Sequence, residues 1–237
     1  MKLTYLFNSG FIVEGERFMM VLDFFRDAHE GFVRQQLTAF QGWVYVLSTH
    51  WHPDHFNPEV MRWKKIRPDI RYVFSKDIFK RKIWMNFRDV DFLVKGQVWE
   101  DDTVRVQAFG STDVGSSFLI EVDGKRIFHA GDLNFWHWSE VSTPEEVQVC
   151  ERHFLKEIGL LAETTTQLDL AMFPVDPRQG KDYMLGAEQF VDRIHTDIFV
   201  PMHFGDDYVK IEAFRDYAQA AGCRFIGWKA KGETIDF

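Results

Sequence analysis

The chain has 237 residues, enough for one large domain or two small ones, and no linker-like run divides it, so we expect a single domain over residues 1–237. A hydrophobic content of 46%, with 24 Phe and 8 Trp, provides a core and an aromatic-walled pocket and argues against internal disorder. With 28 basic and 36 acidic residues the net charge is -8, which disfavours general nucleic-acid binding because a negative surface repels the phosphate backbone.

The first part of the chain predicts short strands followed by alternating helices and strands. Residues 3–23 predict three strands, because turn signals at residues 8–10 and 14–16 separate β-rich segments. Residues 28–40 predict a helix and residues 43–47 a strand. Asn57 and Pro58 are typical of the N-cap and first turn of a helix.

The middle of the chain continues this alternation. We expect a strand at residues 71–74, a helix that contains Phe79, Ile83 and Trp84, and strands near residues 90–94 and 104–109. The helix carries four basic residues, for which a solvated face is the first interpretation and a phosphate site the alternative: Lys76, Lys80, Arg81 and Lys82.

The last part predicts a hairpin and then helices between strands. The hairpin spans residues 117–130 and turns at Asp123 and Gly124, a strong type I′ signal. A helix over 144–161 begins with the capping pattern of Thr143 and Glu146. The remaining elements are a strand at 168–173, a helix at 186–195, a strand at 198–201, a helix at 209–221 and closing strands within 225–237.

Four metal-binding side chains lie within the six residues 50–55. In an extended strand His50 and His52 would point the same way and could hold one cation between them. A proline then bends the backbone, so Asp54 and His55 can serve a second cation close by. A chance surface cluster is a poor alternative, because burying so many titratable groups without a ligand is costly. The pattern therefore predicts two metals.

Two more candidate ligands follow strands in the second half. Asp132 comes after Gly131, which lets the backbone approach a metal closely, and its two carboxylate oxygens could bridge both cations. His203 follows the strand at 198–201. Alone it would more often be a core histidine, but together with the other candidates it predicts a ligand.

The segments at 49–55, 128–132 and 199–203 together resemble, in order, the signature motifs of the metallo-β-lactamase superfamily. The resemblance implies a fold of the α/β (α+β) class, a four-layer αββα sandwich with one or two metals at the sheet edge. Among the branches of the superfamily, the compact single-domain hydrolases related to the ascorbate-phosphate lactonases are the most similar.

The chain departs from the resembled pattern between residues 109 and 117. The superfamily normally supplies a third histidine for the first metal there, whereas this chain offers Asp113, with Ser111 and Thr112 as weaker oxygen ligands. A carboxylate in place of an imidazole shifts the preference towards Mn²⁺ or Fe²⁺, although Zn²⁺ still accepts aspartate. The equal alternative is that Asp113 only caps a turn and the first site is incomplete.

Several residues are expected to surround the ligands. A metal-bound histidine usually donates its other N–H to a carboxylate or carbonyl, and Asp23 is the candidate for that role; turn initiation is the alternative. His129 is expected in the core or just behind the ligands. The candidates for the pocket wall and substrate contacts, which turn chemistry or core packing would also explain, are Trp136, His137, Asp176 and Arg178.

These observations predict a metal-dependent hydrolase that uses a metal-activated water on an ester, lactone or phosphoester bond of a small molecule. We expect two divalent ions, with Zn²⁺ preferred over Mn²⁺ or Fe²⁺. The first would be held by His50, His52 and Asp113 and the second by Asp54, His55 and His203, with Asp132 between them and with His50, His52, Asp54 and Asp132 as the catalytic residues. The alternative is a non-catalytic or regulatory protein that holds one metal, and a nuclease is less favoured.

The expected partner is therefore a small-molecule substrate, without nucleic acid or membrane, and a homo-oligomer is left open. Cys150 and Cys223 lack the spacing of a metal site or a disulfide framework, which fits a reducing cytosol. Residues 1–7 lack the apolar run of a signal peptide, and no run approaches the roughly 20 apolar residues that span a bilayer. We expect a cytoplasmic protein.

Overall fold

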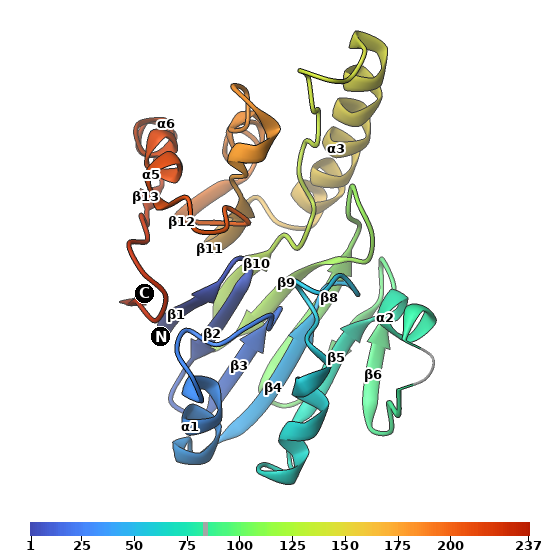
Figure 1. Ribbon diagram of the computed structural model, residues 1–237, viewed down its shortest axis with the longest axis vertical. Coiled ribbons are helices and arrows are strands. Elements are labelled where there is room, and N and C mark those ends of the chain that lie inside the picture. The colour runs from blue at the N-terminus through green and yellow to red at the C-terminus, as the bar shows by residue number, and fades with distance from the viewer. Residues whose placement is uncertain (83–84) are drawn as a thin grey trace. The chain divides into compact units, whose positions relative to one another are not determined.

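Two seven-stranded β-sheets, one in each of two units of the chain, carry the residues that the sequence singles out (Figure 1). The structure is a computed structural model that describes residues 1–82 and 85–237. Unit 1 comprises Met1–Val94 and Trp228–Phe237, and unit 2 comprises Lys95–Gly227. Whether the two units form the single domain that we expect stays a prediction.

The five inner strands of the sheet of unit 1 have almost wholly buried side chains. Its strand order is β14 (Thr234–Asp236), β1 (Lys2–Phe7), β2 (Gly10–Glu14), β3 (Phe18–Leu22), β4 (Trp43–Ser48), β5 (Arg71–Ser75) and β6 (Val90–Leu93). Strands β3 to β6 pair in parallel, so their carboxyl ends meet at one edge. Asp23 and the motif at 49–55 leave the sheet at this edge.

Unit 1 contains two α-helices and one 3₁₀ helix among its described residues: α1 (Phe32–Ala39), η1 (Pro58–Lys65) and α2 (Lys76–Arg81). Asn57 caps η1 as predicted, because its side chain accepts a hydrogen bond from the Glu59 N–H at 2.9 Å. The helix predicted around Phe79 is α2, and its expected continuation through Ile83 and Trp84 lies outside the described residues.

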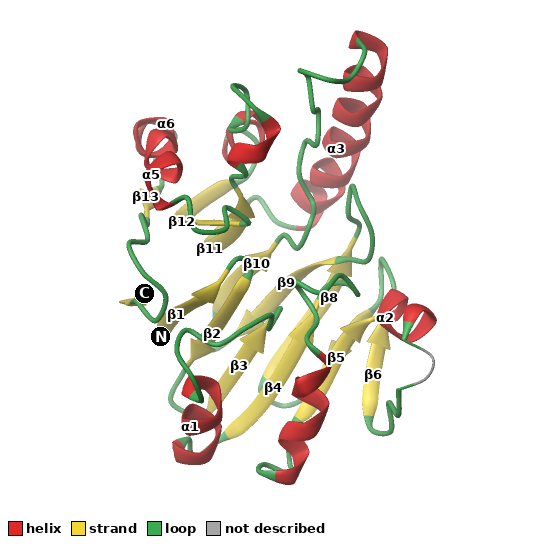
Figure 2. Cartoon of the chain, in the orientation of Figure 1, coloured by secondary structure: helices red, strands yellow, loops and turns green. Residues whose placement is uncertain are grey.

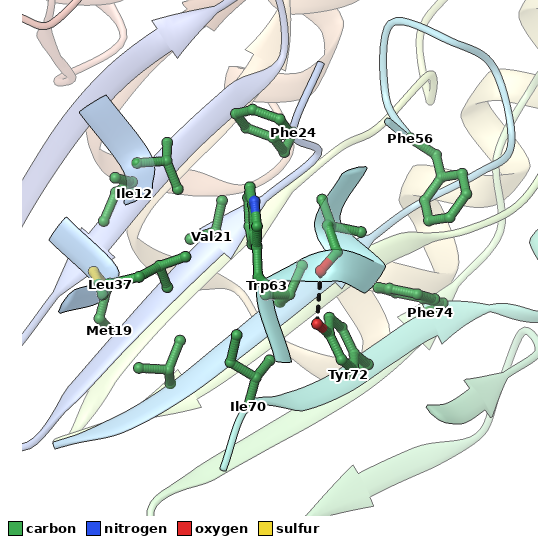
Figure 3. Close-up of a cluster of buried hydrophobic side chains, with 14 of the residues drawn as sticks. Ile12, Met19, Val21, Phe24, Leu37, Phe56, Trp63, Ile70, Tyr72 and Phe74 are labelled. Carbon is green, nitrogen blue, oxygen red and sulfur yellow. Dashed lines mark hydrogen bonds between the residues drawn. The ribbon is translucent and has the colours of Figure 1, made fainter. Parts of the chain in front are cut away.

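A core of buried apolar side chains joins these helices to the sheet (Figure 3). Trp63 of η1 packs edge-on against Phe24, with ring centroids 4.8 Å apart. The Tyr72 hydroxyl of β5 donates a hydrogen bond to the Val60 carbonyl of η1 at 2.6 Å. The 3₁₀ helix that follows the histidine motif is therefore fixed to the sheet that precedes it.

The sheet of unit 2 combines a meander with three parallel strands. Its order is β13 (Arg224–Phe225), β12 (His195–Met202), β11 (Gln167–Pro174), β10 (Lys125–His129), β9 (Ser117–Val122), β8 (Val104–Phe109) and β7 (Val98–Glu100). The predicted hairpin of β9 and β10 is confirmed, with φ of 47° at Asp123 and 75° at Gly124 as a type I′ turn requires. Strands β10, β11 and β12 are parallel, so the segments after them meet at one edge.

The helices of unit 2 follow its strands in chain order (Figure 2). They are α3 (Pro144–Thr164), η2 (Pro177–Gln179), α4 (Leu185–Val191), α5 (Tyr208–Ile211), η3 (Glu212–Phe214) and α6 (Arg215–Ala220). The capping box of α3 is formed by Thr143 and Glu146, as the sequence predicts. No helix among the described residues combines the length and the apolar character that crossing a bilayer requires.

The structure differs from the prediction at three elements. The helix expected to reach His195 ends at Val191, because the His195 N–H bonds to the Thr166 carbonyl at 3.1 Å and starts β12 beside β11. Strand β7 was not predicted. The closing strands expected within 225–237 are short: β13 has two residues and ends at Phe225, and β14 has three.

Candidate metal centre

In unit 1, Asp23 lies at the carboxyl end of β3, beside the histidine motif that follows the neighbouring β4. Its N–H donates to the Leu47 carbonyl at 3.0 Å, and its φ of 41° is in the left-handed region that aspartate tolerates better than most residues. The side chain is only 1% exposed. The parallel pairing of β3 and β4 thus places a buried carboxylate against residues 49–55.

A chain of hydrogen bonds links Asp23 to two histidines. Asp23 Oδ2 accepts from His55 Nδ1 at 2.7 Å and from the Thr49 hydroxyl at 2.6 Å, while Oδ1 accepts from the Thr49 N–H at 2.7 Å. The Thr49 hydroxyl oxygen lies 3.1 Å from His50 Nδ1. Because the hydroxyl proton goes to Asp23, the network assigns a proton to Nδ1 of both histidines. Nε2 is then the nitrogen with which each can bind a cation.

The three histidines of the motif lie side by side. His50 Nε2 is 3.0 Å from His52 Nδ1, and the ring centroids of His50 and His55 are 4.0 Å apart. Ligand atoms of Asp23, His50 and His55 all lie within 4.8 Å of one another, and all three residues are buried. The cluster brings together nitrogen and oxygen donors that suit Zn²⁺.

The geometric reason that we gave for pairing His50 with His52 is wrong, although the two rings are close. Residues 50–55 do not form an extended strand but a turn, in which the His52 carbonyl accepts hydrogen bonds from the N–H groups of His55 and Phe56 at 3.0 and 2.9 Å. The turn folds the rings of the motif onto one another. The alternation of side chains along a strand therefore does not explain why the His50 and His52 rings are close.

Asp54 and Trp51 are each held by a residue that we did not predict. The Asn8 amide, in the turn between β1 and β2, donates to Asp54 Oδ2 at 3.1 Å, and the same oxygen lies 3.6 Å from His55 Nε2. Asp77 accepts a hydrogen bond from the Trp51 N–H at 3.0 Å. Burial raises the pKa of the Asp77 carboxyl, and its hydrogen bonds only partly oppose this.

Two of the four basic residues of the predicted helix lie close to the motif. The Arg81 guanidinium and the Lys82 ammonium are each 5.5 Å from a ring centroid of Trp51. These are cation–π contacts with the residue that separates the first two histidines. Part of this basic cluster therefore adjoins the motif and does not belong to a purely solvated face.

In unit 2, His203 leaves β12 with a φ of 65° and lies between two carboxylates. Its Nδ1 donates to Asp176 Oδ2 at 3.0 Å, and its Nε2 is 3.3 Å from Asp132 Oδ1. Because β10, β11 and β12 are parallel neighbours, Asp132, Asp176 and His203 follow three adjacent strand ends. Unit 2 thus repeats the arrangement of unit 1, in which a buried aspartate holds Nδ1 of a histidine.

Asp176 does not have the substrate-binding position that we predicted. It is fully buried, and the Arg178 guanidinium contacts both of its oxygens, with Nη2 at 2.6 Å from Oδ2. Burial raises the pKa of the Asp176 carboxyl, but hydrogen bonds from His203 and Arg178 outweigh burial and hold the pKa below its usual range. With both oxygens engaged, Asp176 orients His203. The sequence signal for this orienting role was the position of Asp176 directly after β11, because the next strand in the sheet, β12, leads to His203.

Asp132 lies in a loop that Thr112 fastens. Asp132 follows Gly131, whose φ is 54°, as we expected of a close backbone approach. The Thr112 hydroxyl donates to the Asn134 carbonyl at 2.6 Å and accepts from the Asn134 N–H at 2.9 Å. This contact holds the exposed Asp113, the next residue, near the Asp132 loop. Thr112 therefore stabilises the Asp132 loop through hydrogen bonds, whereas we had considered it a weak ligand.

The remaining predicted residues of unit 2 differ in their roles. His129 Nδ1 accepts a hydrogen bond from the Gly131 N–H at 3.1 Å, which places this buried histidine directly behind Asp132. His137 does not fit a substrate contact, because it is 1% exposed, its Nδ1 accepts from the Ser139 N–H and its Nε2 faces the Asp182 carbonyl. The half-buried Trp136 ring is 5.4 Å from His203 and donates its indole N–H to the Asp132 carbonyl at 2.8 Å.

No family model matches the chain. A UPF0173 metal-dependent hydrolase of Pyrococcus abyssi is 22% identical over 217 residues, which cover 86% of this chain and 84% of that protein. Igni18, a metallo hydrolase from the archaeon Ignicoccus hospitalis, matches with a TM-score of 0.70 at 19% identity and covers 100% of this chain and 98% of its own. YhfI, a metallo-β-lactamase fold protein from Bacillus subtilis, matches with a TM-score of 0.68 at 9% identity over 99% and 98% of the two chains.

The chain has the metallo-β-lactamase fold, a mixed α/β architecture with two sheets, as the sequence predicts. Its resemblance to the metallo-β-lactamase superfamily is confirmed, and the similarity to proteins named metal-dependent hydrolases supports a hydrolase. The narrower resemblance to ascorbate-phosphate lactonases stays a prediction.

Proposed function

We propose that the protein is a metal-dependent hydrolase whose predicted ligands bind one pair of divalent cations. The observation that carries the proposal is the repeated aspartate–histidine contact at the carboxyl ends of parallel strands, Asp23 with His55 at 2.7 Å and Asp176 with His203 at 3.0 Å. Such a carboxylate fixes the tautomer and orientation of a metal-binding imidazole. A buried cluster of imidazoles and carboxylates without a cation would be costly.

The donor atoms fit divalent metals. One cation would be held by His50, His52 and Asp113 and the other by Asp54, His55 and His203, with Asp132 between them. The 3.0 Å separation of His50 Nε2 and His52 Nδ1 supports the first group within unit 1, and the 3.3 Å separation of Asp132 Oδ1 and His203 Nε2 supports part of the second within unit 2. Nitrogen donors with a few carboxylates favour Zn²⁺, while Mn²⁺ and Fe²⁺ are alternatives because Asp113 replaces a histidine.

Bound divalent cations would lower the pKa of a water to about 7 and stabilise negative charge that develops on the substrate oxygen. Asp23 and Asp176 keep the protons of His55 and His203 on Nδ1. Asp54 is suited to receive the proton of the attacking water, because Asn8 holds its Oδ2 while its side chain stays 36% exposed. The reaction would cleave an ester, lactone or phosphoester bond.

Trp136 and Arg178 remain the substrate-side residues of the proposal. Trp136 is half-buried beside His203, and the Arg178 side chain is 67% exposed although its guanidinium contacts Asp176. His137 and Asp176 have no place in substrate contact, since their polar atoms are engaged inside unit 2. We further propose a small-molecule substrate and a cytoplasmic location. We also propose that no nucleic acid binds, because the net charge of -8 repels a phosphate backbone.

The test is an activity screen of the purified protein after reloading with Zn²⁺ or Mn²⁺. Carboxylic esters, lactones, phosphomonoesters and phosphodiesters are offered separately, and we expect turnover of one class. Asp132→Ala should abolish this turnover, whereas Asp216→Ala, which removes an exposed aspartate of α6, should keep it. Equal turnover by the Asp132 variant and the wild type would contradict the proposal.

The rival function is that of a non-catalytic or regulatory protein with a single cation. It is favoured by the absence of a histidine between residues 109 and 117, which would leave the first site incomplete. That protein would hold one tightly bound metal per chain and hydrolyse none of the four substrate classes after reloading.

A further inference from the structure

A cavity that none of the metal candidates lines lies within unit 1 and has a volume of about 320 Å³. It lies between the segment after β3, the start of α1 and η1, and its lining residues are Phe24, Asp27, Glu30, Gly31, Val33, Arg34, Glu59 and Trp63. Small-molecule sites typically have volumes of about 300 to 1,000 Å³. The cavity is therefore large enough for a compact organic molecule.

One wall of the cavity is apolar and carries a hydrogen-bond donor, the indole N–H of Trp63. Phe24 and Trp63 meet edge to face at 67°, and Trp63 is only 3% exposed. Figure 3 shows the indole nitrogen at the end of the Trp63 ring system nearest Phe24. No described residue accepts a hydrogen bond from this N–H, and the nitrogen is not among the fully buried polar atoms, so it is accessible to a ligand. A hydrogen-bond acceptor of a ligand in the cavity could pair with this N–H.

The rim of the cavity has an excess of negative charge. Glu30 and Glu59 are exposed, and neither forms an ion pair with a described residue. Asp27 differs from them, because its two oxygens accept the N–H groups of Gly31 and Val33 at 3.1 and 3.0 Å and so cap α1. Arg34 is the one cationic residue of the lining. The two carboxylates of Glu30 and Glu59 outnumber the single guanidinium of Arg34, and this excess of negative charge favours a positively charged ligand.

We propose that this cavity binds a small amine with an apolar body and a hydrogen-bond acceptor, a compound of the class of aromatic amino-acid amides. The apolar body would pack against Phe24 and Trp63, the ammonium would lie between Glu30 and Glu59, and the acceptor would take the Trp63 indole proton. None of the metal candidates lines the cavity. The proposal therefore does not depend on the proposed hydrolysis.

The probe is phenylalaninamide, titrated into ¹⁵N-labelled full-length protein while the tryptophan indole signals are followed by NMR. The signal that disappears in Trp63→Phe belongs to Trp63, and we expect the probe to shift it in a saturable way. N-acetylphenylalaninamide, which lacks the charge, should bind at least about tenfold more weakly. Binding should persist in Asp132→Asn, which separates this site from the metal centre.

Variants of the lining decide the result. Trp63→Phe keeps an aromatic side chain but removes the indole donor. The Glu30→Gln/Glu59→Gln double variant keeps the size of both side chains and removes their charge. Each should weaken binding by about tenfold or more, whereas Trp43→Phe and Glu16→Gln, exposed residues of unit 1 outside the cavity, should not. Absence of a shift at the Trp63 signal, or equal affinity in the wild type and the glutamine variant, would overturn the proposal.

Discussion

At the scale of single residues, the two buried aspartates that hold a histidine are the most informative contacts. Asp23 and Asp176 lie in different units, yet each accepts the Nδ1 proton of a histidine at a strand end. In each aspartate both carboxylate oxygens accept hydrogen bonds, because Thr49 and Arg178 supply further donors beside the histidine. Their function is to orient an imidazole.

We expect Asp23→Asn and Asp176→Asn each to weaken metal binding by about 10- to 100-fold, because the amide can donate to Nδ1 and so favour the wrong tautomer. Competition with a fluorescent chelator measures the affinity. Asp27→Asn is the matched control, since Asp27 caps α1 and contacts no histidine of the motif. Unchanged affinity in both variants would remove the orienting role.

The two cysteines should differ in reactivity. Burial raises the pKa of the Cys223 thiol to about 11, and Cys223 is 3% exposed, whereas Cys150 on α3 is partly exposed. A thiol reagent at pH 8 should therefore modify Cys150 first, because the thiolate is the reactive form. Mass spectrometry of the wild type and of Cys150→Ser checks this prediction, and rapid labelling of the variant would contradict it.

At the scale of elements, the start of α3 should contribute measurably to stability. The Thr143 hydroxyl accepts a hydrogen bond from the Glu146 N–H at 3.3 Å, and the Glu146 carboxylate accepts one from the Thr143 N–H at 2.8 Å. We expect Thr143→Ala to lower the free energy of unfolding by about 1 kcal/mol in urea titration. Thr164→Ala, at the other end of α3, should cost less, and equal losses would show that the cap has no special effect.

The contact between β10 and β11 should depend on pH. Burial raises the pKa of the Asp169 carboxyl, but hydrogen bonds from the Arg126 N–H and the Lys125 ammonium, both at 2.8 Å, lower it below its ordinary value. A lowered pKa means that the carboxylate stabilises the fold above about pH 4 and loses this effect as the pH falls through the folded pKa. The wild type should thus exceed Asp169→Asn in unfolding free energy at pH 7, and this difference should be smaller at pH 3. A gap of the same size at both pH values would contradict this account.

Elements with a clear local signal were predictable, and those that depend on a partner strand were not. The Asp123–Gly124 turn and the Thr143 cap have chemistry that is local to the sequence. The end of α4 was misplaced because β12 begins at His195 only through its pairing with β11. The short β7 is a strand only because it pairs with β8.

At the scale of the whole molecule, each unit supplies a set of imidazoles and carboxylates at the carboxyl edge of its parallel strands. The candidate ligands could be selected from the sequence because they recur at strand ends, where the sequence changes from apolar to titratable. The roles of Asn8, Thr112 and Asp176 were not, because each depends on which segments the sheets bring together. His137 was misjudged because its partner, the Asp182 carbonyl, is distant in sequence.

Elemental analysis of the metal content tests most directly the proposal that the predicted ligands bind a pair of divalent cations. The wild type, His52→Ala from unit 1 and Asp132→Ala from unit 2 would be purified in parallel, with circular dichroism to confirm folding. We predict two equivalents of divalent metal per wild-type chain and a clear loss in each variant. Full metal content in both variants would contradict the account.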